Sequence, residues 1–100
     1  MKTIDQRVQA GIKFLDEKYG DKWIEKIDLG KLDLASNNCC ILGQLDVNYT
    51  SHRKKLELDE DQCRAFGFNI ICGRPENGGD GGFDNLSDVW QIELRKLGVK

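Results

Sequence analysis

The chain has 100 residues and a net charge of −2, with 39% hydrophobic and 32% charged residues. This length suits one compact domain, taken as residues 1–100, and the composition excludes a disordered chain. The small negative charge gives no general attraction for nucleic acid or an anionic membrane, and no apolar run approaches the ~20 residues of a membrane span.

The N-terminal segment predicts an amphipathic helix over residues 4–19. Thr3 and Gln6 have the spacing of a capping box, and apolar residues then recur every three or four positions up to Tyr19, with Arg7 on the polar face. This polar segment has no apolar centre of the kind that a signal peptide needs. We therefore expect a cytoplasmic protein, whose cysteines are reduced.

The centre of the chain predicts short helices joined by irregular segments. A helical turn is expected from Asp21, and the irregular stretch "IDLGKLDLAS" follows it. Two further short helices are expected, one starting near Thr50 and one capped by Asp59. Residues 68–72, "FNIIC", are apolar and β-branched, which is typical of a short strand.

Asn85 is expected to cap a last helix that ends at Gly98. The predicted fold is mainly α, a small α+β single domain in which amphipathic N- and C-terminal helices surround short central helices and one short strand. The side chains expected in its core are apolar or sulfur-containing: Leu15, Trp23, Leu34, Cys40, Leu42, Leu45, Phe66, Phe68, Trp90 and Leu94.

Residues 73–84, "GRPENGGDGGFD", are rich in glycine and predict a surface loop. The segment lacks the lysine and the terminal hydroxyl residue of a phosphate-binding loop. We expect it to contact a partner, and alanine at Asp80 or Phe83 to weaken binding while leaving the melting temperature nearly unchanged. The candidate partner-binding residues are Arg74, Asn77, Asp80, Phe83 and Asp84.

Four cysteines and one histidine are the candidate metal ligands or nucleophiles. Cys39 and Cys40 are adjacent, which does not match the paired spacing of a zinc site, and His52 lies in the basic segment "TSHRKK", which is typical of an exposed turn. We interpret the cysteines mainly as core residues and expect no metal, no cofactor and no catalytic group. The weak metal candidates are Cys40, Cys63, Cys72 and His52.

Three segments, "IDLGKLDLASNNCCILGQL", "LELDEDQCRAFGF" and "LSDVWQIEL", together resemble a group of small, uncharacterised phage-encoded proteins with an "LDLxS…C-[IV]-LGQL" centre. The similar proteins often have two cysteines separated by two residues before "LGQL". Here Asn37 stands in the first place and Cys39 adjoins Cys40. The matching residues are Leu32, Asp33, Leu34, Ser36, Cys40, Leu42, Gly43, Gln44, Leu45, Gly67, Phe68 and Trp90.

The resemblance implies a phage origin and the cytoplasm of the host cell, but no activity. Our leading hypothesis is a non-enzymatic binding protein that inhibits or modulates a host protein by stoichiometric contact. Components of anti-phage defence are among the candidate host proteins. The alternative is a protein that binds or sequesters a nucleotide or small ligand through Arg74, Asn77 and the amides of residues 78–82. A third is a zinc- or thiol-dependent protein built on Cys40. The partner is expected to be a host or phage protein, not a membrane or nucleic acid, and the oligomeric state stays open.

Overall fold

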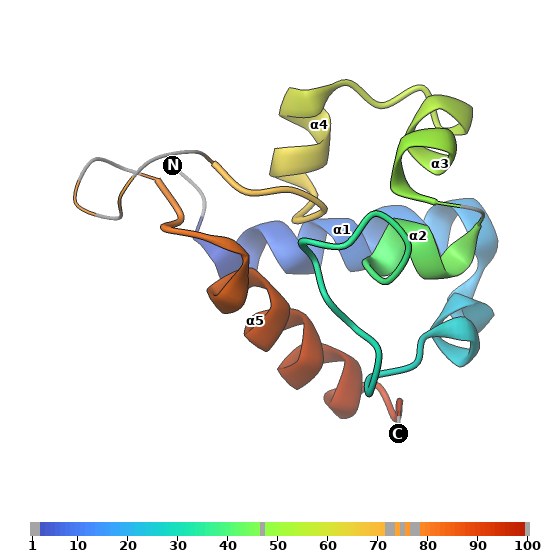
Figure 1. Cartoon of the computed structure of the whole chain (residues 1–100). Coiled ribbons are helices and arrows are strands. Elements are labelled where there is room, and N and C mark those ends of the chain that lie inside the picture. Colours follow the sequence, from blue (N-terminus) through green and yellow to red (C-terminus); the bar gives the residue numbers. More distant parts are fainter. Residues whose placement is uncertain (1–2, 47, 72–73, 75, 77–78, 100) are drawn as a thin grey trace.

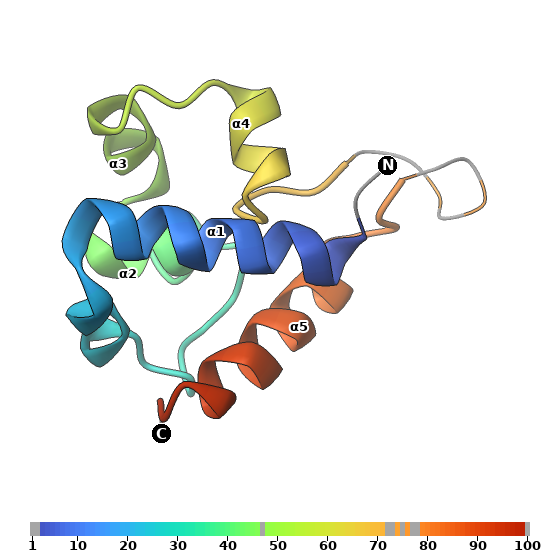
Figure 2. The ribbon, with the colours of Figure 1, turned by 180° about the vertical axis from the view of Figure 1, so that it is seen from behind.

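The computed structural model describes residues 3–46, 48–71, 74, 76 and 79–99. Helix α1 runs through the middle of the molecule, with α3 and α4 on one side of it and α5 on the other (Figure 1, and from behind in Figure 2). The mainly α prediction is therefore confirmed for the described residues. The helices in chain order are α1 (Ile4–Tyr19), the 3₁₀-helix η1 (Asp21–Lys26), α2 (Ile41–Leu45), α3 (Tyr49–Lys55), α4 (Glu60–Ala65) and α5 (Phe83–Lys96).

The strand predicted over residues 68–72 is not seen in the part of that segment that the structure describes. Side chains satisfy several of its backbone groups, whereas the Phe68 amide donates to the Cys63 carbonyl and the Ile71 carbonyl accepts from the Asp80 amide. The Asn69 carbonyl accepts a hydrogen bond from the Arg7 guanidinium at 3.0 Å, and the Ile71 amide donates to the Asp80 carboxylate at 2.6 Å. Residues 68–71 thus form an irregular segment, bent at Phe68 and Asn69, with no partner strand among the described residues.

The two ends of α1 follow the sequence prediction. The Thr3 hydroxyl accepts a hydrogen bond from the Gln6 amide at 3.2 Å, and the Gln6 side chain accepts one from the Thr3 amide at 3.0 Å, so the capping box is confirmed. At the other end, Gly20 has a φ of +77°, a conformation that glycine adopts without steric cost. This turn redirects the chain from α1 into η1.

Helix α1 packs closely against the turn that follows α4. A Cβ atom at Gly11 would overlap the Phe66 carbonyl oxygen, so only glycine allows the two backbones to approach in this way. The neighbouring Gly67 carbonyl accepts a 2.6 Å hydrogen bond from the indole nitrogen of Trp90, which is fully buried. This contact joins α1, α4 and α5 at one point.

Three shorter helices begin with a side-chain cap or a glycine. Asp59 and Gln62 form the second capping box of the chain, as the expected cap of α4 requires. Helix α3 is capped by Asn48, slightly before the predicted start near Thr50. Asn85 is not the cap of the last helix, because α5 begins at Phe83 after an extended Gly82, which places Asn85 within the first turn.

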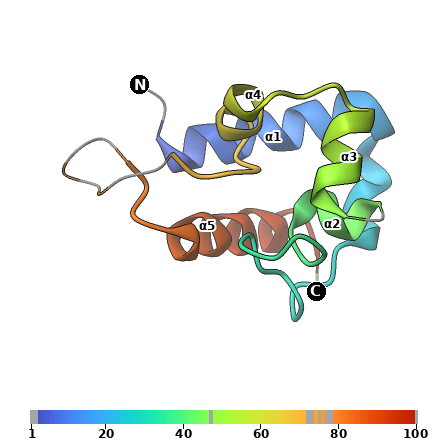
Figure 3. The ribbon, with the colours of Figure 1, turned by 45° about the horizontal axis from the view of Figure 1, so that its top comes forward.

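Figure 3 shows α1 and α5 lying along one another, with α2 and α3 at one end. Between these helices the structure buries eight of the ten side chains expected in the core and half-buries Leu45 and Phe66, which pack against it. The eight buried ones are Leu15, Trp23, Leu34, Cys40, Leu42, Phe68, Trp90 and Leu94. Within the described part of the chain, no helix is long and apolar enough to cross a membrane.

Candidate functional site

The structure separates the five loop residues that the sequence predicts to contact a partner. Arg74 and Asp84 are exposed, whereas Phe83 is half-buried and packs against the core. Asp80 is only 7% exposed, so its side chain belongs to the interior and not to a contact surface. Asn77 lies outside the described residues. The exposed members of this set therefore stay predictions as partner contacts.

Asp80 forms a buried ion pair with Arg7, which lies inside the protein and not on the polar face expected for it. Two guanidinium nitrogens donate to the two carboxylate oxygens at 2.8 and 2.7 Å. Burial alone would raise the pKa of Asp80, but the hydrogen bonds from Arg7 and the Ile71 amide, with the Arg7 charge, hold it below its ordinary value. The pair fastens the loop to α1, so we expect Asp80→Ala to lower the melting temperature, which reverses the sequence prediction.

The cysteines that the structure describes lie in or against the core. Cys40 is buried, and its sulfur accepts a hydrogen bond from the Gly43 amide at 3.2 Å, so it caps α2. Cys63 is buried as well, Cys39 is half-buried, and all three are free thiols. Burial raises the pKa of Cys40 and of Cys63, which makes both thiols poor nucleophiles. No group of three or more candidate metal ligands occurs among the described residues, and Cys72 lies outside them.

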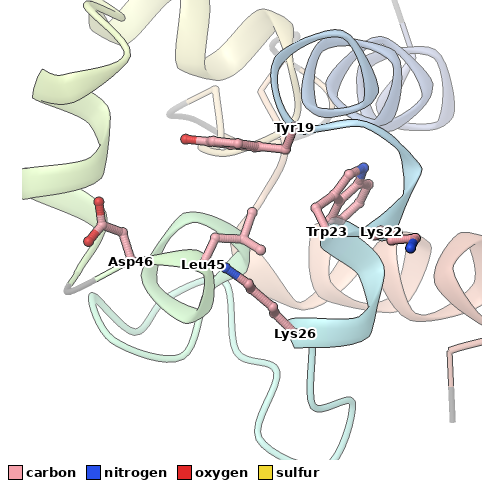
Figure 4. A pocket seen from close by; sticks show the side chains of 6 residues that line it. All are labelled: Tyr19, Lys22, Trp23, Lys26, Leu45 and Asp46. Atoms are coloured by element: carbon pink, nitrogen blue, oxygen red, sulfur yellow. The ribbon is translucent and has the colours of Figure 1, made fainter.

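A pocket of about 420 Å³ opens where the end of α1, η1 and the end of α2 meet. Figure 4 shows the Tyr19 ring on one side of this pocket, Trp23 on a second side and Leu45 between them. Tyr19 is 48% exposed and Trp23 only 3%, so the indole forms an apolar floor and the phenol a partly free wall. The residues that line the pocket are Tyr19, Lys22, Trp23, Lys26, Leu45 and Asp46.

The floor of the pocket is held by a hydrogen bond back to α1. The indole nitrogen of Trp23 donates to a carboxylate oxygen of Asp16 at 2.7 Å. Gly20, between the two helices, supplies the positive φ that brings η1 back toward α1. This hydrogen bond therefore fixes the orientation of the indole.

The wall of the pocket is held by His52, which is buried and not on an exposed turn as its basic neighbours suggested. One ring nitrogen, Nδ1, lies 2.9 Å from the Leu42 carbonyl oxygen, and the other, Nε2, lies 2.6 Å from the Tyr19 hydroxyl oxygen. A carbonyl only accepts, so we assign the proton to Nδ1, and the Tyr19 hydroxyl then donates to Nε2 in the neutral ring. His52 thus links α1, α2 and α3 at the back of the pocket.

The Tyr19–His52 contact positions the phenol and does not activate it. Burial raises the pKa of Tyr19, and the Asp46 carboxylate raises it further, while the Lys55 charge offsets part of this effect. The hydroxyl therefore stays protonated at neutral pH. Asp46 itself accepts a 2.8 Å hydrogen bond from Lys55, so its charge is compensated.

A second cavity, of about 240 Å³, has Tyr49 on its wall, together with residues such as Phe68 and Phe83. The Tyr49 hydroxyl oxygen is buried and, among the described residues, makes no well-formed hydrogen bond. Its neighbour is the Cys63 thiol, and burial raises the pKa of Tyr49 as well. With the Cys63 thiol, a weak hydrogen-bonding group, as its neighbour, this hydroxyl is a poorly satisfied polar group within the core.

Sequence reasoning missed the pocket because Tyr19 was placed on the buried stripe of the first helix. Its position beside Gly20 is the one local signal, since an aromatic residue in the last turn of a helix lies where the chain leaves the core. No such local signal shows that Leu45 and Asp46 line the same pocket. They come from a separate part of the chain.

No protein-family model, no curated protein and no solved structure matches this chain. The resemblance to small phage proteins therefore stays a prediction from the sequence. The geometry of the pocket is the basis for a functional proposal.

Proposed function

We propose that this chain is a small binding protein that acts on another protein by stoichiometric contact, without catalysis, and that the pocket between α1, η1 and α2 is its contact site. The observation that carries the proposal is the fixed but half-exposed Tyr19 ring beside a buried indole. Aromatic side chains in such settings are the residues that most often dominate the energy of protein interfaces.

Pre-organisation makes the pocket suitable for this purpose. Trp23 and Tyr19 are already held in place because the indole donates a hydrogen bond to Asp16 and the phenol donates one to His52, so binding orders few side chains. Burying the rest of the Tyr19 ring against a partner supplies about 1–2 kcal/mol, and a partner group in the pocket adds a comparable amount. Further contacts around the pocket would have to supply the rest of the binding energy of a specific complex.

The proposed partner is a protein of the bacterial host, with a component of anti-phage defence as one candidate. The resemblance of the central "LDLASNNCCILGQL" segment to small phage proteins supports this choice. Small phage proteins without catalytic motifs often act by binding a host enzyme, which they inhibit or redirect. The pocket favours contact with a protein, but its residues do not specify which host protein is bound.

The test compares three forms of the tagged chain on a bacterial lysate: the wild type, Tyr19→Ser, and Ile92→Ser as a matched control. Ile92 is 52% exposed on α5, so its removal changes a surface of similar exposure outside the pocket. We expect the wild type and Ile92→Ser to retain one protein in a saturable one-to-one complex, and Tyr19→Ser to lose it. Equal retention by all three forms would place the contact elsewhere, and a melting curve of each form excludes unfolding as the cause.

A further inference from the structure

The lysines on the rim of the pocket carry charges that the described residues do not compensate. Lys22 and Lys26 are exposed, and neither forms an ion pair with any residue that the structure describes. Figure 4 shows Lys26 extending from η1 toward Leu45, with Lys22 on the other side of Trp23. The pocket therefore combines an apolar interior with a cationic rim on its η1 side.

Acidic groups near the pocket do not cancel this rim. Asp46, on the α2 side, lies 2.8 Å from the Lys55 ammonium group, which compensates it. Glu25 belongs to η1 but lines a different cavity, together with Ile24 and Gly98. A ligand that enters the pocket from solvent thus meets two lysines on the η1 side, an aromatic surface, and on the α2 side the Asp46 carboxylate with its Lys55 partner.

We propose that the pocket binds a segment of the partner protein in which one large apolar side chain is flanked by carboxylates. This inference rests on the proposed function and names the chemistry of the partner. A volume of about 420 Å³ lies in the lower part of the range of ligand pockets and leaves room for a large side chain. In an extended segment the residues two positions before and after the anchor point to the same side as the anchor, so carboxylates at those positions would face the rim that carries Lys22 and Lys26.

The position of the pocket at the end of α1 favours this occupant over a nucleotide. The carboxyl end of a helix carries a partial negative charge, which disfavours a phosphate held deep in the pocket. Nucleotide phosphates are more often held by backbone amides of a helix start or a glycine-rich loop. An acidic segment keeps its charges at the rim and places only an apolar group against Tyr19 and Trp23. Charges at a rim set specificity and association rate more than affinity.

The test is selection of binders from a random peptide library displayed on a surface, with the wild-type chain as the target. Each selected peptide is then measured against Lys22→Glu/Lys26→Glu and against the control Lys13→Glu/Lys31→Glu. Lys13 and Lys31 are exposed and line none of the pocket, so both double variants change the net charge equally. We expect the selected peptides to have an apolar residue between aspartates or glutamates. Their affinity should be about tenfold or more weaker for Lys22→Glu/Lys26→Glu and nearly unchanged for the control variant. The difference should shrink at high salt.

Other outcomes separate the inference from the proposed function. If the selected peptides have no excess of acidic residues but still fail to bind Tyr19→Ser, the inference of an acidic partner segment is refuted and the proposed contact site is retained. Peptides that bind Tyr19→Ser as well as the wild type, or a library that yields no binder, would overturn both. Displacement of the peptide by ATP, from the wild type and from the control variant, would identify a small-anion site and contradict a peptide partner.

Discussion

Asp80→Ala is expected to lower the free energy of unfolding by about 3–5 kcal/mol, because it leaves the Arg7 guanidinium buried without its counter-ion. Arg7 is 3% exposed, and it would keep only its hydrogen bonds to the carbonyls of Arg64 and Asn69, at 2.8 and 3.0 Å. The Ile71 amide, which donates to Asp80 at 2.6 Å, would lose its acceptor as well. For a domain of this size the loss corresponds to more than about 10 °C in melting temperature.

Urea denaturation, followed by circular dichroism and tryptophan fluorescence, measures this change. Asp84→Ala is the matched control, since Asp84 is exposed a few residues away in the first turn of α5 and should change stability by less than about 1 kcal/mol. In the double variant Arg7→Met/Asp80→Ala the loss should be smaller than the sum of the two single losses, by about 1–3 kcal/mol. An Asp80→Ala protein as stable as the Asp84→Ala control would refute the reasoning.

The pH dependence of this pair has a definite sign. The folded-state pKa of Asp80 lies below its ordinary value of 3.8, so the unfolded chain binds this proton more readily than the folded one. The stabilisation from the pair is therefore fully present above about pH 4 and is lost as the pH falls through the lower folded pKa. The stability difference between the wild type and Asp80→Ala should shrink on acidification; a difference that grows would contradict this assignment.

Three further predictions follow from the packing. Gly11→Ala should destabilise the protein by about 1–3 kcal/mol in urea denaturation, although alanine is the better helix former, because its methyl group meets the Phe66 carbonyl; a more stable variant would contradict the close approach. Tyr49→Phe should be as stable as the wild type or up to about 1 kcal/mol more stable in the same assay, since it removes a poorly satisfied buried hydroxyl; a loss of similar size would show that the hydroxyl has a partner. Cys40 and Cys63 should resist iodoacetamide in the native protein and react in denaturant, as peptide mass spectrometry reads out; rapid native modification would show that they are accessible.

The parts of the fold that could be predicted from the sequence depend on neighbouring residues. Two capping boxes satisfy backbone donors within three positions of the chain, one with Thr3 and Gln6 and one with Asp59 and Gln62. The local sequence is therefore enough to specify them. Residues 68–71 were predicted to form a strand because apolar, β-branched residues are typical of one, but the structure shows an irregular segment. Its backbone groups bond to Arg7 and Asp80, which come from distant parts of the chain and leave no local signal.

The candidate site was hidden for the same physical reason. Arg7 and Asp80 are 73 positions apart, and Tyr19 and His52 are 33 apart, so no local pattern brings them together. A charged residue beside an apolar stripe is predicted to be exposed when its buried partner is unknown, and for this reason Arg7 was wrongly assigned to the polar face of the first helix. His52 was likewise assigned to the surface because its basic neighbours dominate the local sequence.

The measurement that tests the central claim most directly is the affinity of the captured partner for the wild type, Tyr19→Ser and Ile92→Ser, determined by titration calorimetry. The account predicts one-to-one binding that Tyr19→Ser weakens about tenfold to a hundredfold, while Ile92→Ser leaves it nearly unchanged. Equal affinities for the wild type and Tyr19→Ser would show that the pocket between α1, η1 and α2 is not the contact site.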